Sequence, residues 1–271
     1  MSSNKRTEGE KLFERYLASQ DIPFEFEKKQ PGKSKLPDYS IEWRGKTVLF
    51  DVKDFAPPDD LTGGSGAFDP YPRIREKIEQ GRDKFREFKN VCCALVLCNL
   101  GNPFVMLQDA HIMLGAMYGD SGFSFPVNVT TGIGDDTKLK RTFLNNGKMI
   151  RPQWSKPQNT TIAALITLSS IRPHEAHEID HYSRLINVMK ENRGKTIEEY
   201  EAALRRKIPT YDPDLVVPRV IVWHNAFARI PLPDDLFCGP FDSHLGVART
   251  NEGLFQEVTF RGVELPESVK L

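Results

Sequence analysis

Residues 37–55 read PDYSIEWRGKTVLFDVKDF, and this stretch decides the fold predicted for the chain. Two runs rich in aromatic and β-branched residues flank the dipeptide Arg44-Gly45, a pattern that indicates two strands joined by a tight turn. If those two residues form the whole turn, pairing outward from it sets Asp38 opposite Asp51. The stretch therefore predicts a β-hairpin with two facing carboxylates at its open end.

The period of two along a strand gives this hairpin two different faces. Asp51 and Lys53 share one face, whereas Phe50 and Val52 point to the other. Directly opposed carboxylates repel each other, so a cation is needed to offset the charges of Asp38 and Asp51. Mg²⁺, which prefers oxygen ligands, is the expected cation. Lys53 would lie one strand step away, where its ammonium could act on a water or on a phosphate.

Other interpretations of the same residues stay open. One further loop residue would change the register and make Asp38 a diagonal neighbour of Asp51. An Asp at the start of a strand is often only a turn former, and Asp51 with Lys53 could be a solvated strand face with a weak ion pair.

Helices and strands are predicted on both sides of the hairpin. An amphipathic helix over 8–19 carries Gly9 in the middle of its apolar stripe, where a close neighbour could pack. Five further segments complete the first part of the chain: a strand at 22–29, an irregular loop after residue 55, a helix at 73–89, an apolar strand at 91–98 and a helix near 110–119. A helix between two strands implies a crossover and hence some parallel pairing.

The whole chain is predicted to be one α/β domain with a mixed sheet. A catalytic core would occupy 1–120, an irregular basic insertion 121–158, and an extension of the sheet with a helix 159–271. In that last part, the expected elements are strands at 161–168 and 219–228 and a helix at 176–206.

At Pro37-Asp38 and Asp51-Val52-Lys53, the chain resembles the PD-(D/E)xK nuclease superfamily, which has the restriction-endonuclease-like fold. The resemblance covers roughly residues 8 to 100, in the order helix, three-strand meander, helix, strand. It implies a Mg²⁺ site, in which Mn²⁺ may substitute, with Asp38, Asp51 and the Val52 carbonyl as ligands. It also implies that Lys53 assists the attacking water.

The family often adds a Glu from its first helix, and Glu10 is the best placed candidate. At about 100° per residue, it lies just past Leu17 at the border of the buried stripe. However, Thr7-Glu8-Gly9-Glu10 is also a capping box, in which Glu10 would bond the Thr7 backbone N–H. Both interpretations remain open.

Two sets of residues are candidates for substrate binding. The first is a polar stripe along the helix after the motif, which would otherwise be a solvated flank of that helix; its members are Arg73, Lys77, Gln80 and Lys84. The second lies in the basic insertion, because residues 137–174 hold seven basic and no acidic residues. Its candidates for phosphate contact are Lys138, Lys140 and Arg141, although a solvated basic loop explains them as well.

Composition narrows the classes of function. The chain has 271 residues, with 37 Lys and Arg against 37 Asp and Glu, so net charge does not argue for a nucleic-acid partner. We expect a cytoplasmic protein without a membrane span, because no apolar run is long enough. Three of its four cysteines fall in the apolar run VCCALVLC, which predicts buried thiols and not a disulfide framework.

Two histidine motifs offer other interpretations. His177-Glu178-Ile179-Asp180-His181 fits the H-E-x-x-H pattern of zinc proteases, and His174 could add a ligand. The polar surroundings favour a surface helix instead. His224-Asn225, at the end of an apolar run, could contact a substrate or could cap the strand.

The function expected from the sequence is that of a Mg²⁺-dependent endonuclease that hydrolyses DNA, in restriction, phage defence or repair. Three alternatives remain: a catalytically silent nucleic-acid-binding module, an RNA-directed nuclease, and a zinc metalloprotease. A homodimer, and one or two metal ions, are left open.

Overall fold

The structure is a computed structural model that describes most of the chain. The described residues are 6–29, 32–57, 69–134, 140–143, 147–150, 157–172, 194, 196–199, 214–249 and 255–261. They form an α/β protein built on one mixed sheet, as the sequence predicts.

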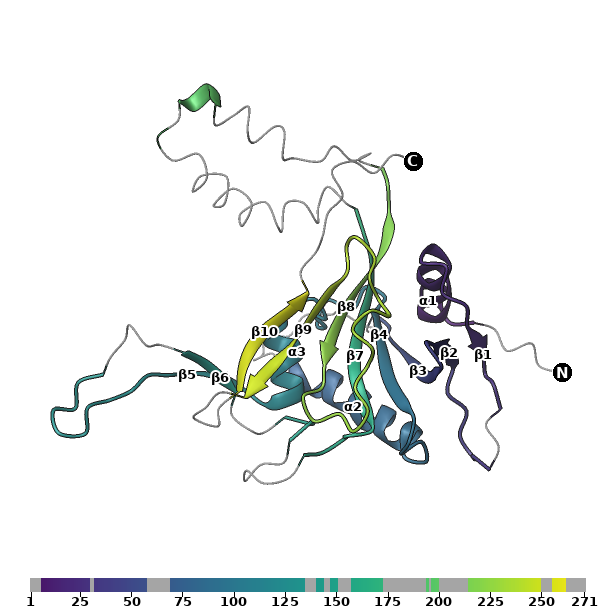
Figure 1. The fold of residues 1–271 in the computed structure, drawn as a ribbon, viewed down its shortest axis with the longest axis horizontal. Helices are drawn as coiled ribbons and strands as arrows, with labels where there is room; N and C mark the ends of the chain where they lie inside the picture. The colour runs from purple at the N-terminus through teal and green to yellow at the C-terminus, as the bar shows by residue number, and fades with distance from the viewer. Residues whose placement is uncertain are drawn as a thin grey trace.

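The sheet has eight strands in the order β1-β2-β3-β4-β7-β8-β9-β10 (Figure 1). The strands are β1 (Glu25–Phe26), β2 (Tyr39–Trp43), β3 (Lys46–Phe55), β4 (Cys92–Asn99), β7 (Ile162–Ile171), β8 (Val217–His224), β9 (Ser243–Arg249) and β10 (Phe255–Arg261). β3, β4 and β7 pair in parallel at the centre, and β8 pairs in parallel with β9. The remaining pairs are antiparallel. The predicted crossover from β3 to β4 is confirmed.

Helices cover the two faces of the sheet. α2 (Tyr71–Phe85) and α3 (Ala110–Tyr118) pack on the face that carries Leu49 and Leu95, whereas α1 (Glu8–Ser19) packs on the face that carries Phe50 and Val96. Successive strand residues alternate between the two faces, and helices cover both faces, so the central strands place apolar residues on both sides. α1 and α2 therefore lie on opposite sides of β3.

The β2–β3 hairpin has the predicted two-residue turn. Arg44 and Gly45 both take a positive φ, 50° and 75°, as a tight hairpin turn requires. The pairing runs from Trp43 opposite Lys46 to Tyr39 opposite Phe50. The predicted register is confirmed, and it directs Asp38 and Asp51 toward each other.

Gly9 allows the close packing of α1 on β3 and β4. A Cβ on Gly9 would lie 1.9 Å from Asp54 Oδ1 and 3.0 Å from Cys98 Sγ. The Gly9 N–H donates to Asp54 Oδ2 at 3.3 Å, so a carboxylate meets the first turn of the helix, where the helix dipole favours negative charge. The close neighbour predicted at Gly9 is therefore Asp54.

Several predicted boundaries are corrected. The first strand is only Glu25–Phe26, because Glu27 takes a φ of 46° that ends the extended backbone. β8 starts at Val217 and stops at His224, because Asn225 turns the chain by accepting the Phe227 N–H. The predicted helix at 176–206 lies mostly outside the described residues. Where it is described, Gly194 takes a φ of 89° and the Thr196 side chain accepts the Glu199 N–H, so a single helix does not run through this point; residues 197–199 are helical. β9 and β10 have no counterpart in the sequence prediction.

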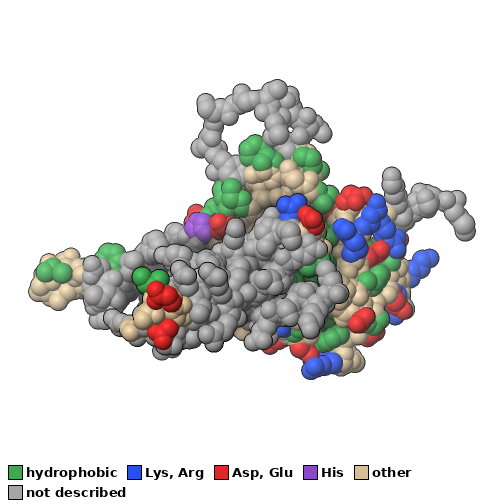
Figure 2. Space-filling model, turned by 90° about the horizontal axis from the view of Figure 1, so that it is seen from above, with side chains coloured by type: hydrophobic (Ala, Val, Ile, Leu, Met, Phe, Trp, Pro, Cys, Tyr) green, Lys and Arg blue, Asp and Glu red, His purple; other side chains and the backbone are tan. Residues whose placement is uncertain are grey.

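The insertion is more regular than predicted. β5 (Ser121–Ser124) and β6 (Lys140–Phe143) form a two-stranded antiparallel sheet, and β6 contacts β10. The tip between them, residues 125–134, is ordered around Asn128, whose side chain accepts the N–H groups of Thr130 and Thr131. The tip projects from the body and carries no charged side chain, as Figure 2 shows at the far left.

None of the described helices has the length and hydrophobicity needed to cross a membrane.

Candidate active site

Asp51 is the buried centre of the candidate site. Its side chain has no exposed surface, and it lies within ion-pair distance of two lysines. Lys53 Nζ is 2.7 Å from Oδ2 and Lys84 Nζ is 2.9 Å from Oδ1. Neither oxygen receives a hydrogen bond of normal geometry. A fully buried carboxylate in this state is costly unless cations offset its charge.

Asp38 joins Asp51 through the same ammonium group. Lys84 Nζ is 3.0 Å from Asp38 Oδ1, so one cation bridges an oxygen of each carboxylate. Asp38 Oδ2 accepts the Val52 N–H at 2.7 Å. The two acids converge on one point, as the hairpin register predicts. What the structure shows for Val52 is its N–H bound to Asp38; a contact through its carbonyl stays a prediction.

The packing of α2 delivers Lys84 to this point. Ile74, Ile78 and Phe85 are buried along one side of the helix, and Gly81 lies against Leu95 of β4. A Cβ on Gly81 would be 3.0 Å from Leu95 Cδ1, so the helix approaches the sheet closely. Lys84 follows one turn later on the flank that faces β3.

The basic loop just before Asp38 contacts the C-terminal end of α2. Lys33 Nζ donates to the Glu87 carbonyl and Lys35 Nζ to the Asp83 carbonyl, each at 2.6 Å, and Ser34 bonds the Glu87 carboxylate. Cations are favourable at a helix C-terminus, where carbonyl groups lack partners. This loop, residues 32–37, was missed by sequence reasoning; the alternation of Lys33 and Lys35 just before Pro37 was the available signal.

The electrostatics follow from burial and from the paired charges. Burial and, next to it, the neighbouring charge of Asp51 together raise the pKa of Asp38 to about 6. Burial would lower the pKa of the Lys84 ammonium, but the charges of Asp51 and Asp38 outweigh it and raise that pKa. Lys84 is therefore a cation at neutral pH, and the two carboxylates and two ammonium groups balance.

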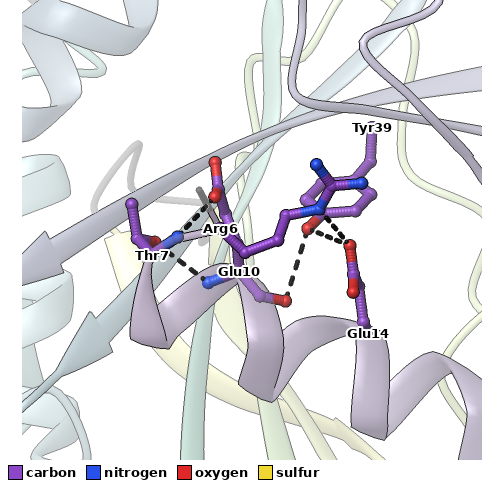
Figure 3. Close-up of polar contacts among 5 residues, drawn as sticks. All are labelled: Arg6, Thr7, Glu10, Glu14 and Tyr39. Carbon is purple, nitrogen blue, oxygen red and sulfur yellow. Dashed lines mark hydrogen bonds and ion pairs between the residues drawn. The ribbon is translucent and has the colours of Figure 1, made fainter. Parts of the chain in front are cut away.

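Glu10 does not join this site. Figure 3 shows the capping box, in which Glu10 Oε2 accepts the Thr7 N–H at 2.7 Å and Thr7 Oγ1 accepts the Glu10 N–H. The neighbouring Glu14 accepts from Arg6 and from the Tyr39 hydroxyl. α1 covers the opposite face of β3 from Lys84. The expectation that Glu10 ligates a metal with Asp51 is therefore corrected, because Glu10 caps α1 and because α1 lies on the other face of the sheet.

Lys84 is the one member of the predicted polar stripe that the structure brings to the carboxylates, among the contacts of the described residues. Lys77 lies with Nζ 5.7 Å from the centre of the Phe55 ring, and Arg73 lies over the Phe104 ring. Gln80 donates to Glu76 on its own helix. These three residues come earlier on α2 than Lys84, so the helix places them farther from Asp38.

The basic insertion also lies away from the carboxylates. Lys140 and Arg141 belong to β6, which contacts β10 at the far edge of the sheet. β3 is five strand spacings from β10, about 24 Å at the usual spacing of strands. These residues therefore do not lie beside Asp38 and Asp51, and their contact with a substrate phosphate stays a prediction. Lys138 lies outside the described residues.

The site can hold part of a metal coordination sphere. Two carboxylate oxygens face one point, which Lys84 Nζ occupies, and the contacts of the Asp51 oxygens are ion pairs with Lys53 and Lys84. Within the described ranges there is no cluster of three or more His, Cys, Asp or Glu side chains placed to hold a metal ion. Two carboxylates suit Mg²⁺, which keeps several waters and takes further oxygens from a substrate phosphate.

In the second histidine motif, His224-Asn225, the asparagine has a structural role. The Asn225 side chain donates to the Ile162 carbonyl at 2.7 Å and caps the end of β8. His224 Nε2 lies 2.9 Å from His244 Nδ1, and His244 Nε2 lies 2.7 Å from the Phe237 carbonyl. A carbonyl only accepts, so His244 carries its proton on Nε2, and His224 donates to it. His174, His177 and His181 lie outside the described residues.

Comparisons with family models, with curated proteins and with solved structures gave no significant match to this chain. The resemblance to PD-(D/E)xK nucleases therefore stays a prediction from the motif residues.

Proposed function

We propose that the protein is a Mg²⁺-dependent nuclease of the PD-(D/E)xK kind that hydrolyses phosphodiester bonds in DNA. The observation that carries the proposal is the convergence of Asp38 Oδ1 and Asp51 Oδ1 on one point, with Lys53 beside them on the same face of β3. Two carboxylates that meet at one point, with a lysine beside them, suit metal-assisted hydrolysis of a phosphodiester.

Each residue has a distinct task in this proposal. Asp38 and Asp51 would hold the metal, and the hydrogen bond from Val52 fixes the orientation of Asp38. When bound, the metal would polarise the phosphate and lower the pKa of the attacking water. Lys53 keeps its ammonium at the rim of the site, with about a fifth of its side chain exposed, where it can orient the water and stabilise negative charge on the phosphate.

One observation favours a catalytically silent nucleic-acid-binding protein as the second candidate. Lys84 already balances the carboxylates, so the four charged groups are stable as a structural ion-pair network without any metal. Such a protein would bind nucleic acid but would not cleave it. A measurement of phosphodiester cleavage therefore distinguishes the two candidates.

A substrate panel tests the proposal. The full chain is incubated with circular duplex, linear duplex, single-stranded and branched DNA and with RNA, each with Mg²⁺, Mn²⁺ or EDTA. The proposal predicts cleavage of DNA with Mg²⁺ or Mn²⁺ and none with EDTA. Cutting of the circular duplex identifies an endonuclease. Binding without cleavage on every substrate would support the silent module instead, and cleavage of RNA alone would reassign the substrate.

A further inference from the structure

Lys84 lies where a divalent cation would bridge the two carboxylates. Its Nζ is 3.0 Å from Asp38 Oδ1 and 2.9 Å from Asp51 Oδ1. Lys53, by contrast, is paired with the other oxygen of Asp51. The two lysines are therefore not equivalent. Lys53 lies beside the pair of carboxylates, whereas Lys84 lies between the two carboxylates.

We infer that Lys84 is the resident counter-ion of the carboxylate pair, and that it competes with the metal for Asp38 Oδ1 and Asp51 Oδ1. This inference rests on the proposed function. Mg²⁺ binds oxygen at about 2.0–2.1 Å, so a metal that bridges these two oxygens needs the space that the ammonium fills. Binding of the metal therefore requires Lys84 to leave.

The surrounding contacts allow this exchange to move Lys84 alone. Asp51 is fully buried, and Asp38 is held through its second oxygen by the Val52 N–H. The backbone of α2 is fixed by the contact of Gly81 with Leu95. Lys84 has a quarter of its side chain exposed and a flexible four-carbon stem, so its ammonium can swing toward solvent.

The exchange also couples the metal to the substrate through charge. Asp38, Asp51, Lys53 and Lys84 together are neutral. With Lys84 displaced toward solvent, a divalent cation would leave the site with an excess of one positive charge. A phosphodiester anion reduces that excess by one. Metal and phosphodiester should therefore tighten each other's binding, and linkage makes the effect reciprocal. A variant without the Lys84 charge starts from a net charge of −1 and should bind metal well without substrate.

The test is a Mn²⁺ titration of the full chain without nucleic acid, followed by electron paramagnetic resonance. Lys84→Met should bind Mn²⁺ about tenfold more tightly than the parent, and Lys84→Arg more weakly, because a guanidinium can hold both carboxylates. Lys11→Met, at a partly exposed position of α1 on the other face of the sheet, is the control and should match the parent.

Thermal unfolding gives an independent readout. In EDTA, Lys84→Met should unfold at a lower temperature than the parent, because two buried carboxylates lose a shared cation. Saturating Mn²⁺ should raise the Tm of Lys84→Met more than it raises that of the parent.

The outcomes separate the two proposals. Mn²⁺ binding that is equal or weaker in Lys84→Met would overturn the counter-ion role and leave the metal site in place. If Lys84→Met does not fold without metal, Lys84→Arg decides, because an affinity equal to or above that of the parent would overturn the inference. No Mn²⁺ binding to any of these proteins would overturn the proposed function and the inference with it.

Discussion

Asp38 Oδ2 accepts the backbone N–H of Val52 at 2.7 Å, which joins the two halves of the motif across the β2–β3 hairpin. The pairing of the hairpin stops at Tyr39 and Phe50. The side chain of Asp38, the residue just before β2, then supplies the hydrogen-bond acceptor for the Val52 N–H. The bond occupies one oxygen and leaves the other facing Lys84. Asp38 is thus both a structural acceptor and a candidate ligand.

Substitutions of Asp38 should separate these two roles. Asp38→Asn keeps an oxygen that can accept the Val52 N–H, and it removes a charge that is costly to bury. We expect its free energy of unfolding in EDTA at pH 7 to stay within about 1 kcal/mol of the parent's. Asp38→Ala leaves the N–H without its partner and should lose about 1–3 kcal/mol. Urea unfolding measures both, and equal losses would contradict the role of the hydrogen bond.

A side chain at residue 9 should disturb the contact between α1 and β3. Gly9→Ala places a methyl group 1.9 Å from Asp54 Oδ1 in the present arrangement, so the helix or the carboxylate must shift. We expect a loss of about 1–3 kcal/mol in the free energy of unfolding, as for other overpacked sites. Chemical denaturation of the purified variant measures it.

The matched control for Gly9 is a double-mutant cycle with Asp54→Ala. Once the carboxylate is removed, Gly9→Ala should cost clearly less than it does in the parent. The same cost in both backgrounds would show that Asp54 is not the residue that excludes a side chain at this position.

The histidine pair should make the protein sensitive to acid. Burial and, next to it, the neighbouring His244 together lower the pKa of His224 to about 4. Because the ordinary value is 6.5, the unfolded chain takes up a proton that the folded chain refuses between pH 6.5 and 4. The stabilisation is complete above pH 6.5 and is lost as the pH falls to 4, by on the order of 3 kcal/mol.

The difference between His224→Gln and the parent isolates this effect from the carboxylates that titrate in the same range. Urea unfolding from pH 7 to pH 4 should show a shallower loss of stability in His224→Gln. His111→Gln, on the exposed side of α3, is the control and should follow the parent. Parallel curves for His224→Gln and the parent would contradict the assignment.

The hairpin could be predicted from sequence because its determinants are local. Arg44-Gly45 fixes the turn, and the period of two fixes which residues share a face, so the register and the meeting of Asp38 with Asp51 follow. β1 could not be bounded in this way, because the backbone angle of Glu27 ends it and no residue type signals that angle. β9 and β10 were not predicted because tertiary pairing, and not a local pattern, makes them strands.

The candidate site was predictable where it depends on one hairpin and not where it depends on packing. The angle of Glu10 on its helix is the same whether it caps the helix or ligates a metal; the face of the sheet that α1 covers makes the difference. Likewise, the polar stripe on α2 could be read from spacing, but the choice of Lys84 depends on the close approach of Gly81 to Leu95.

The measurement that tests the central claim most directly is Mg²⁺-dependent cleavage of a circular DNA duplex by Asp51→Asn and Lys53→Met, with Lys11→Met on the other face of the sheet as the control. Circular dichroism first establishes that each variant is folded. We predict losses in cleavage rate of at least about 100-fold for Asp51→Asn and Lys53→Met, and a rate close to the parent's for Lys11→Met. Parent-like cleavage by folded Asp51→Asn would contradict the claim that Asp38 and Asp51 form the metal site of a nuclease.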